Sequence, residues 1–191
     1  MTTFYTGAGD SGTTTDFVSA RRESKGSQFF AALGTLDETV SMLGFCRASL
    51  LKSHFNSDAE LVLGLQQNLF TIQAELAGSD KRLGDEKVRA LEVQITELGR
   101  TLPEIRTFLI PGESELSALF DLARTVARRA ERELVRLRDE SLERGSPASV
   151  SLIRVRPPVL AYMNRLSSLL YVLARREAKK SGAKEQPPKY S

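Results

Sequence analysis

The stretch SELSALFDLARTVARRAERELVRLRDESLE, residues 114–143, determines the fold class, because its apolar residues recur every three or four positions along its whole length. This spacing places them on one face of an α-helix. The apolar positions are Leu116, Leu119, Ala123, Val126, Ala130, Leu134 and Leu137. A long helix with one apolar face must pack that face against other helices, so the stretch predicts a helical bundle.

Four other segments have the same periodicity and predict helices over residues 27–52, 57–79, 85–102 and 157–182. Ser57-Asp58-Ala59-Glu60 is typical of a capping box at the start of the second. Pro103 is expected to end the third, and Gly145-Ser146-Pro147 predicts a break before the last. The expected fold is all-α, an up-down five-helix bundle in a single domain over residues 1–191. It carries a glycine- and threonine-rich N-terminal loop (residues 1–26), without a sheet, and a frayed tail (residues 183–191).

Composition excludes several classes of protein. The chain has 191 residues, enough to bury a large core. Its single cysteine, Cys46, excludes a disulfide framework, and its single histidine, His54, argues against a histidine metal cluster or a Ser-His-Asp hydrolase. No apolar run approaches the roughly 18 residues of a membrane span, and the N-terminus does not resemble a signal peptide, so we expect a cytoplasmic protein with no membrane contact.

Positive charge is concentrated in residues 124–138, which contain six arginines and two glutamates and so carry a local net charge of +4. Because the whole chain carries +3, the remainder sums to −1, which argues against a nucleic-acid partner. Arg124, Arg128, Arg132 and Arg136 are spaced by four and are expected to share one helix face, where like charges repel by about 0.2–0.5 kcal/mol per pair. The row is either a solvated face or a site for an anion, such as a polyphosphate or a carboxylate of another subunit.

The N-terminal segment TGAGDSGTTT, residues 6–15, contains a G-x-G-x-x-G pattern at Gly7, Gly9 and Gly12. It is not a dinucleotide-binding fingerprint, because no strand precedes it and no helix follows at once, and it lacks the Gly-Lys of a P-loop. Two interpretations remain open: a flexible tail, or a loop whose backbone N–H groups and hydroxyls surround an anion.

Three further sites each have an ordinary and a functional interpretation. Asp37 and Glu38 are either helix-flank carboxylates or ion-pair partners of the arginines. Asn164 and Arg165 are either structural residues at the core margin or groups that orient a nucleotide. The apolar loop Phe108-Leu109-Ile110-Pro111-Gly112 either covers the core or contacts a ligand.

Five ordered blocks make the chain resemble the PduO-type ATP:cob(I)alamin adenosyltransferases over nearly its full length. The blocks are YTGAGDSGTT (residues 5–14), GTLDE (34–38), FLIPG (108–112), ARTVARRAER (123–132) and NRLS (164–167), with Lys25 where the family places a lysine. The resemblance implies a homotrimer of ferritin-like five-helix bundles that transfers the 5′-deoxyadenosyl group of ATP to cob(I)alamin, with Mg²⁺ carried by ATP.

The resemblance also implies roles for individual residues. Asp37 would pair with Arg128 across a subunit interface, and Phe108 would press on the corrinoid; with Arg128, these are the expected catalytic residues. The expected nucleotide-binding residues are Thr6, Gly7, Ala8, Gly9, Asp10, Thr14, Thr15, Lys25, Arg128, Arg129, Glu131, Arg132 and Asn164. A cobalamin-dependent mutase as acceptor and a flavin reductase are the expected protein partners.

Several positions differ from the family pattern: Leu33 stands in place of an aromatic residue, Thr39-Val40 in place of Leu-Asn, Glu113 in place of a glycine, and Ser168 in place of an aspartate. Glu113 and Ser168 bear most on the corrinoid side. They motivate an alternative function, a non-catalytic protein that binds ATP or corrinoid, or delivers the cofactor.

Overall fold

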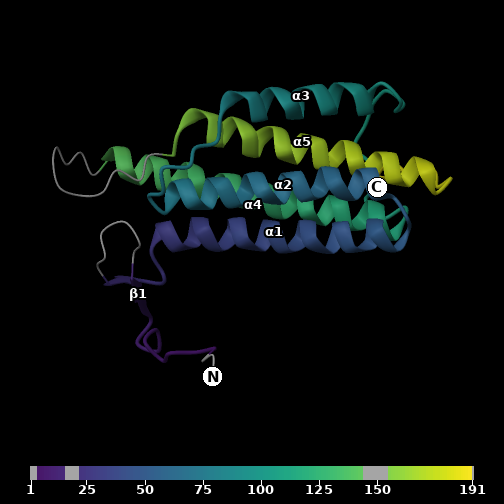
Figure 1. The fold of residues 1–191 in the computed structure, drawn as a ribbon. Helices are drawn as coiled ribbons and strands as arrows, with labels where there is room; N and C mark the ends of the chain where they lie inside the picture. The colour runs from purple at the N-terminus through teal and green to yellow at the C-terminus, as the bar shows by residue number, and fades with distance from the viewer. Residues whose placement is uncertain (1–3, 16–21, 144–154, 191) are drawn as a thin grey trace.

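The computed structural model describes residues 4–15, 22–143 and 155–190, and within them the chain forms five long helices (Figure 1). These are α1 (Gln28–Lys52), α2 (Asn56–Leu76), α3 (Asp85–Gly99), α4 (Glu115–Glu143) and α5 (Pro157–Lys180). The predicted all-α five-helix bundle is therefore confirmed, with helix ends within a few residues of those expected. The predicted break at Gly145-Ser146-Pro147 lies outside the described residues.

Helices α1, α2, α4 and α5 build the core as antiparallel neighbours, and α3 packs outside against α5. Gln28, at the start of α1, donates a hydrogen bond to the main-chain oxygen of Glu133 in α4 (2.8 Å). Lys180, at the end of α5, donates to Asp58 at the start of α2 (3.1 Å). Because of this antiparallel order, α1 and α4 begin at opposite ends of the bundle.

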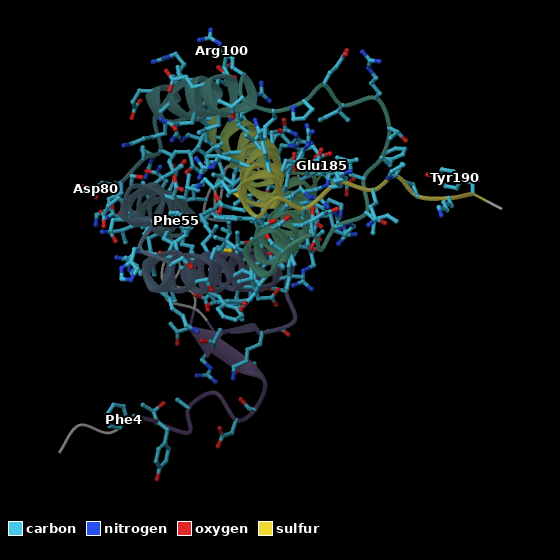
Figure 2. All side chains as sticks on the ribbon, turned by 90° about the vertical axis from the view of Figure 1, so that its right-hand side faces the viewer. Phe4, Phe55, Asp80, Arg100, Glu185 and Tyr190 are labelled. Atoms are coloured by element: carbon cyan, nitrogen blue, oxygen red, sulfur yellow. The ribbon has the colours of Figure 1, made fainter. Side chains whose placement is uncertain are left out.

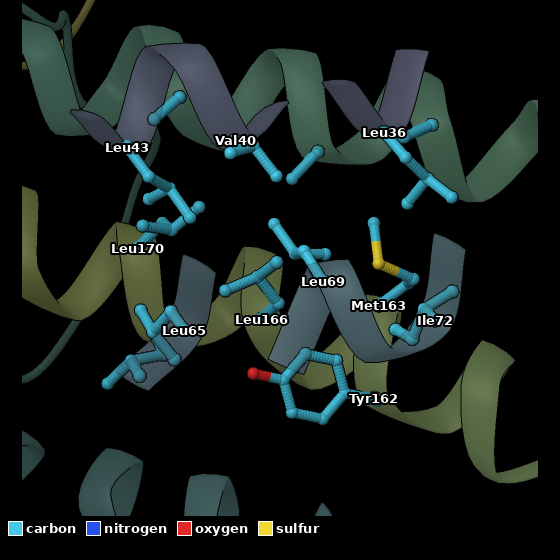
Figure 3. Packing of buried hydrophobic residues seen from close by; sticks show 14 of the residues in the cluster. Leu36, Val40, Leu43, Leu65, Leu69, Ile72, Tyr162, Met163, Leu166 and Leu170 are labelled. Atoms are coloured by element: carbon cyan, nitrogen blue, oxygen red, sulfur yellow. The ribbon is translucent and has the colours of Figure 1, made fainter. Parts of the chain in front are cut away.

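Aliphatic side chains from several helices fill the core, as Figure 3 shows for Leu36 and Leu43 of α1, Leu69 of α2 and Leu166 of α5. Helix α4 contributes smaller side chains beside them, which lets its neighbours approach closely. Its fully buried alanines are Ala123, Ala127 and Ala130. Because these positions face inward, the arginines between them face the margins or the surface of the bundle.

Cys46 lies in this core, and burial, only partly offset by a backbone hydrogen bond, raises the pKa of its thiol to about 12. It is therefore an unreactive core thiol, as predicted. Among the described helices, α1 alone is long and apolar enough to resemble a membrane span, with a mean hydropathy of 1.2 over its most apolar window. Eight of its residues are nevertheless buried within the bundle, which is expected of a central helix in a helical core.

The predicted capping box at Ser57 is wrong, because α2 begins one residue earlier at Asn56 and Phe55, its N-cap residue, makes no side-chain capping bond. Asp58 instead forms ion pairs with Arg176 (2.6 Å) and Lys180 (3.1 Å) of α5. Burial alone would raise the pKa of Asp58, but the hydrogen bonds and charges of these two cations outweigh it and lower the pKa. Asp58 thus joins two helices and caps neither.

Two expectations about the chain ends are also wrong. The N-terminal segment was expected to have no sheet, but β1 (Thr13–Thr15) pairs antiparallel with β2 (Arg22–Ser24), with Thr14 opposite Glu23. The tail was expected to be frayed, but Glu185 is held by Arg175, and the main-chain oxygen of Gln186 accepts a hydrogen bond from Ile110 (2.8 Å). In both cases the pairing joins segments whose contact no local pattern indicates.

A buried carboxylate, Glu75, ties the end of α2 to the start of α5. Its two oxygens accept hydrogen bonds from Arg156 (2.5 and 2.9 Å), and one also accepts from the amide of Leu83 (2.9 Å). Arg156 in turn donates to the main-chain oxygen of Leu83 (2.8 Å). Burial on its own would raise the pKa of Glu75, which is 8% exposed, but the hydrogen bonds from Arg156 and Leu83 outweigh it and lower the pKa.

We expect Glu75→Gln to lower the free energy of unfolding by roughly 2 kcal/mol at pH 7, because buried donors lose a charged acceptor. Since the folded pKa of Glu75 lies below its ordinary value of about 4.3, its contribution is present above that pH and is lost as pH falls through the folded pKa. Urea denaturation at fixed protein concentration measures the difference in unfolding free energy between the variant and the wild type, which should shrink below about pH 4.

Glu104→Gln, in the exposed pair with Arg106, is the control and should change stability by less than about 0.5 kcal/mol. Equal stability of Glu75→Gln and wild type at pH 7 would contradict this role.

Candidate functional site

The N-terminal loop is built from consecutive turns that require its glycines. Gly7 and Gly12 have φ angles of +69° and +76°, in the left-handed region that favours glycine. The amide of Asp10 donates to the oxygen of Gly7, and that of Gly12 to the oxygen of Gly9, both at 3.1 Å. A Cβ atom on Gly9 would lie 2.7 Å from the Nζ atom of Lys25. The loop therefore has a defined conformation, which argues against the flexible-tail interpretation.

Two cations from the strand side hold this loop together. Lys25 donates from Nζ to the oxygen of Gly9 (2.8 Å) and from its amide to the oxygen of Gly12 (2.9 Å). Arg22 donates to the oxygen of Ala8 (2.6 Å) and to Oγ1 of Thr13 (3.0 Å from Nε). Sequence reasoning selected Lys25 but missed Arg22. Only the pairing of β1 with β2, which brings Arg22 beside the loop, could have indicated it.

The loop projects away from its own bundle, as Figures 1 and 2 show. Phe4 and Tyr5 are 96% and 81% exposed, and Thr6, Gly7 and Ala8 are exposed as well. Among the described residues, the hydrogen bonds of the loop run to its own turns, to Arg22 and to Lys25. Within one chain, the predicted phosphate-binding residues are therefore not brought together with those of α4 and α5.

A second group of predicted residues does come together, on the flank between α4 and α5. Asn164 donates from Nδ2 to Oε1 of Glu131 (3.1 Å) and accepts at Oδ1 from Arg165 (2.7 Å). Arg165 also donates to Oε1 of Glu92 on α3 (3.0 Å). These bonds define which way the amide of Asn164 faces. Glu92 was not predicted, because no sequence pattern relates α3 to this flank.

The arginines of α4 do not form the single row that their spacing predicted. Four residues correspond to about 400° of helix, so each step drifts by about 40° around the axis. Arg124 lies at the margin facing α5, paired with Asp121 (2.7 Å) and 6.0 Å from the centre of the Tyr171 ring. Arg136 pairs with Glu133 (2.5 Å). The predicted row therefore winds around the helix.

The two arginines in the middle of the row, Arg128 and Arg132, are exposed. No hydrogen bond or ion pair is formed by either side chain within the described part of the chain. Their neighbour Arg129 pairs instead with Glu38 of α1. Asp37, next to Glu38, is exposed and makes no such contact with any described residue. The predicted pair of Asp37 with Arg128 is therefore not formed within one chain, and both groups face outward.

The Phe108 loop, residues 104–113 between α3 and α4, presents apolar side chains to the surface. Phe108 is 79% exposed, and Ile105 and Ile110 are exposed as well. The alternative in which this loop only covers the core is therefore wrong for Phe108. The loop precedes α4, whereas the N-terminal loop precedes α1, so the two lie at opposite ends of the bundle. Helix α1 alone is roughly 37 Å long at 1.5 Å per residue.

Comparison with known proteins gives consistent matches. The family described as "Cobalamin adenosyltransferase" matches residues 4–177. The chain is 38% identical over 181 residues to the corrinoid adenosyltransferase PduO of Citrobacter freundii, covering 91% of this chain and 49% of that protein. It thus spans about half the length of that relative. A second corrinoid adenosyltransferase of the same organism is 34% identical, covering 93% of this chain and 96% of that protein.

The fold is shared with solved structures. One is a PduO-type ATP:corrinoid adenosyltransferase from Lactobacillus reuteri, in a variant with one phenylalanine replaced by histidine, complexed with cobalamin and ATP. It superimposes with a TM-score of 0.82 at 26% identity, covering 97% of this chain and 96% of that one.

We expect Arg22→Ala to loosen the N-terminal loop while the helices stay intact, because only hydrogen bonds to residues 8–13 are lost. Amide exchange at Gly12 and Lys25 should accelerate by about tenfold, since several hydrogen bonds of the loop depend on the same guanidinium. Hydrogen exchange read by NMR measures this, with the helical circular dichroism signal as the check on folding. Arg100→Ala, at the exposed end of α3, is the matched control. Unchanged exchange at both amides would remove Arg22 from this role.

Proposed function

Because the chain belongs to the cobalamin adenosyltransferase family, we propose that it transfers the 5′-deoxyadenosyl group of ATP to cob(I)alamin, giving adenosylcobalamin and triphosphate. The observation that carries the proposal is the separation of its two loops. A donor-rich loop and an exposed apolar loop suit a polyphosphate and a corrinoid respectively, yet they lie at opposite ends of one bundle. A second copy of the chain would bring such loops together.

The proposed reaction needs no nucleophile from the protein. The electron pair of Co(I) attacks C5′ of ATP, the cobalt–carbon bond forms, the C5′–O bond breaks, and its electron pair leaves on triphosphate. The protein has to position C5′ against cobalt and stabilise the charge on the leaving group. This agrees with a chain whose only cysteine is buried and whose only histidine lies outside the candidate site.

On the nucleotide side, the N-terminal loop would surround the triphosphate. Its turns contain five of the expected residues, and β1 adds two more: Thr6, Gly7, Ala8, Gly9 and Asp10 in the turns, and Thr14 and Thr15 in β1. Lys25 already holds the loop through the oxygen of Gly9 and would add a positive charge beside the phosphates. The Nζ atom of Lys25 carries three N–H donors, so it could donate to a phosphate oxygen as well as to the oxygen of Gly9.

From α4 and α5, the exposed guanidinium groups of Arg128 and Arg132 would neutralise phosphate oxygens, where the planar fork of arginine bonds bidentately. Arg129 would be available once its exposed pair with Glu38 exchanges for a phosphate. Glu131 and Asn164, already joined by a hydrogen bond, would orient the nucleoside.

Mg²⁺ is the one metal that the proposed reaction implies. Among the described residues no group of three or more histidine, cysteine, aspartate or glutamate side chains could hold a metal ion. Mg²⁺ binds mainly through substrate phosphates and water with one or two carboxylates, so the ion would arrive on ATP. Asp10, exposed in the phosphate loop, is the carboxylate positioned to help. The ion would neutralise charge on the triphosphate as it leaves.

The site would be completed in a homotrimer, with the loop of one copy reaching α4 and α5 of the next. Asp37 and Arg128 support this arrangement, because both are exposed and carry no partner among the described residues. Opposite charges left facing outward on adjoining helices can pair between copies. The pair would then determine how α1 of one copy meets α4 of its neighbour.

On the corrinoid side, Phe108 would press on the lower face of the ring. Displacing the lower ligand favours four-coordinate Co(II), which is the state that can be reduced to Co(I). The exposed phenyl, on a loop with Ile105 and Ile110, offers an apolar surface for such a contact. A flavin reductase in the cytoplasm would supply the electron, and a cobalamin-dependent mutase would receive the product.

Turnover separates this function from cofactor delivery. ATP mixed with chemically reduced cobalamin should give adenosylcobalamin, followed in the visible spectrum, and one triphosphate per product. Binding of both ligands without turnover would instead favour a delivery protein, the function that Glu113 and Ser168 motivate.

We expect Phe108→Ala to reduce turnover at least about tenfold when Co(II) must be reduced in the site, while KM for ATP stays near wild type. Prereduced cob(I)alamin should restore part of the activity. Because the side chain is exposed, stability should change by less than about 0.5 kcal/mol, so thermal unfolding is the check on folding. Leu142→Ala, an exposed apolar residue at the end of α4, is the control and should leave both assays unchanged. Wild-type turnover of Phe108→Ala from Co(II) would remove Phe108 from the site.

A further inference from the structure

A buried arginine of α5, Arg175, joins the C-terminal tail to the Phe108 loop. Arg175 is only 6% exposed, and its guanidinium pairs bidentately with Glu185, at 2.5 Å to Oε1 and 2.8 Å to Oε2. The same group donates to the main-chain oxygen of Pro103 (3.1 Å), where the chain leaves α3 for the loop. One side chain thus holds the tail and the start of the loop together.

A second bond joins the tail to the middle of the loop. The amide of Ile110 donates to the main-chain oxygen of Gln186 (2.8 Å), one residue after Glu185. Figure 2 shows Glu185 at this end of the bundle, beside α5. The loop has no helix or strand of its own, so its backbone depends on contacts such as these.

The space between loop, tail and helices is too small to be a binding site. It has a volume of about 30 Å³, lined in part by Leu109, Pro111, Tyr171 and Glu185. That is room for no more than about two water molecules. The tail and the loop are therefore packed against each other, and the effect of this contact is to hold the Phe108 loop in place.

We propose that residues 183–190 form a strap that positions the Phe108 loop, with Arg175 and Glu185 as the positioning residues. The proposal rests on the proposed function for its consequence: the strap acts on corrinoid binding and leaves ATP binding unchanged. The reason is geometric. Phe108 lies between the two attachment points, Pro103 and Ile110, whereas the N-terminal loop is held by Arg22 and Lys25 and takes no part in these bonds.

Burial makes the pair a firm attachment. A charge-assisted, bidentate bond to a carboxylate is stronger than a neutral hydrogen bond, and a buried guanidinium is costly to leave without its partner. Freed from the strap, the loop would sample many conformations. Its exposed phenyl would then have to be ordered again when a corrinoid binds, at a cost in affinity.

Two readouts test the proposal on Glu185→Gln and on a chain that ends at Gly182. In the substrate-free protein, amide exchange at Ile110 should accelerate about tenfold in both variants, because its acceptor is lost or loosened. In the assay, KM for cob(I)alamin should rise severalfold while KM for ATP stays within about twofold. Glu185→Asp keeps the charge and should recover part of both effects, and Lys189→Ala, exposed in the same tail, should show neither.

Unchanged exchange at Ile110 in both variants would overturn the proposal, as would a rise in KM for ATP equal to that for cob(I)alamin. Because exchange is measured without substrates, it tests the strap even if the protein transfers no adenosyl group. Absence of turnover in the wild type, with faster exchange at Ile110 in the variants, would refute the proposed function and leave the strap standing as a structural device.

Discussion

Helix α4 packs its alanine face between α1 and α5, and this close contact determines where the charged residues of the candidate site can lie. Ala123, Ala127 and Ala130 are fully buried, so the positions between them must face a flank or the surface. Arg129 therefore reaches Glu38 on α1, and Glu131 reaches Asn164 on α5. A larger side chain at one of the alanines would push the helices apart and rotate every one of these groups.

The same packing separates the functional parts along the bundle. Because α1 and α4 are antiparallel, the loops that precede them emerge at opposite ends. Arg128 and Arg132, halfway along α4, face outward between these ends. One chain thus presents a loop rich in hydrogen-bond donors, a cationic helix face and an apolar loop without joining them. In the proposed homotrimer, repetition of the chain around a closed ring would join them, and assembly would then be a condition of activity.

Most of the fold follows from local pattern, and most of the errors concern contacts between distant segments. Apolar residues at helical spacing identified all five helices, since burial of one face dominates helix stability in a bundle. Asp58 was taken for part of a cap, but the end of α5 offers it two cations that no local rule could indicate. The arginine spacing was interpreted correctly as helical and wrongly as one straight row, because the drift of the helix was left out. Arg22 and Glu185 escaped notice for a similar reason. Each acts through partners at least nine residues away, and nothing local distinguishes it from other charged side chains.

The central claim, that the site is shared between copies, is tested most directly by complementation between two inactive variants. Lys25→Ala removes a group of the N-terminal loop, and Asn164→Ala removes a group of the α5 flank. Coexpressed with different tags and purified through both, the mixed assembly should regain activity, because some sites combine an intact loop from one copy with an intact flank from another. In a trimer that contains both variants, one of the three sites combines an intact loop with an intact flank, so about a third of the wild-type activity is expected. A mixed assembly that forms normally and stays as inactive as each variant alone would contradict a shared site and return both groups to a single chain.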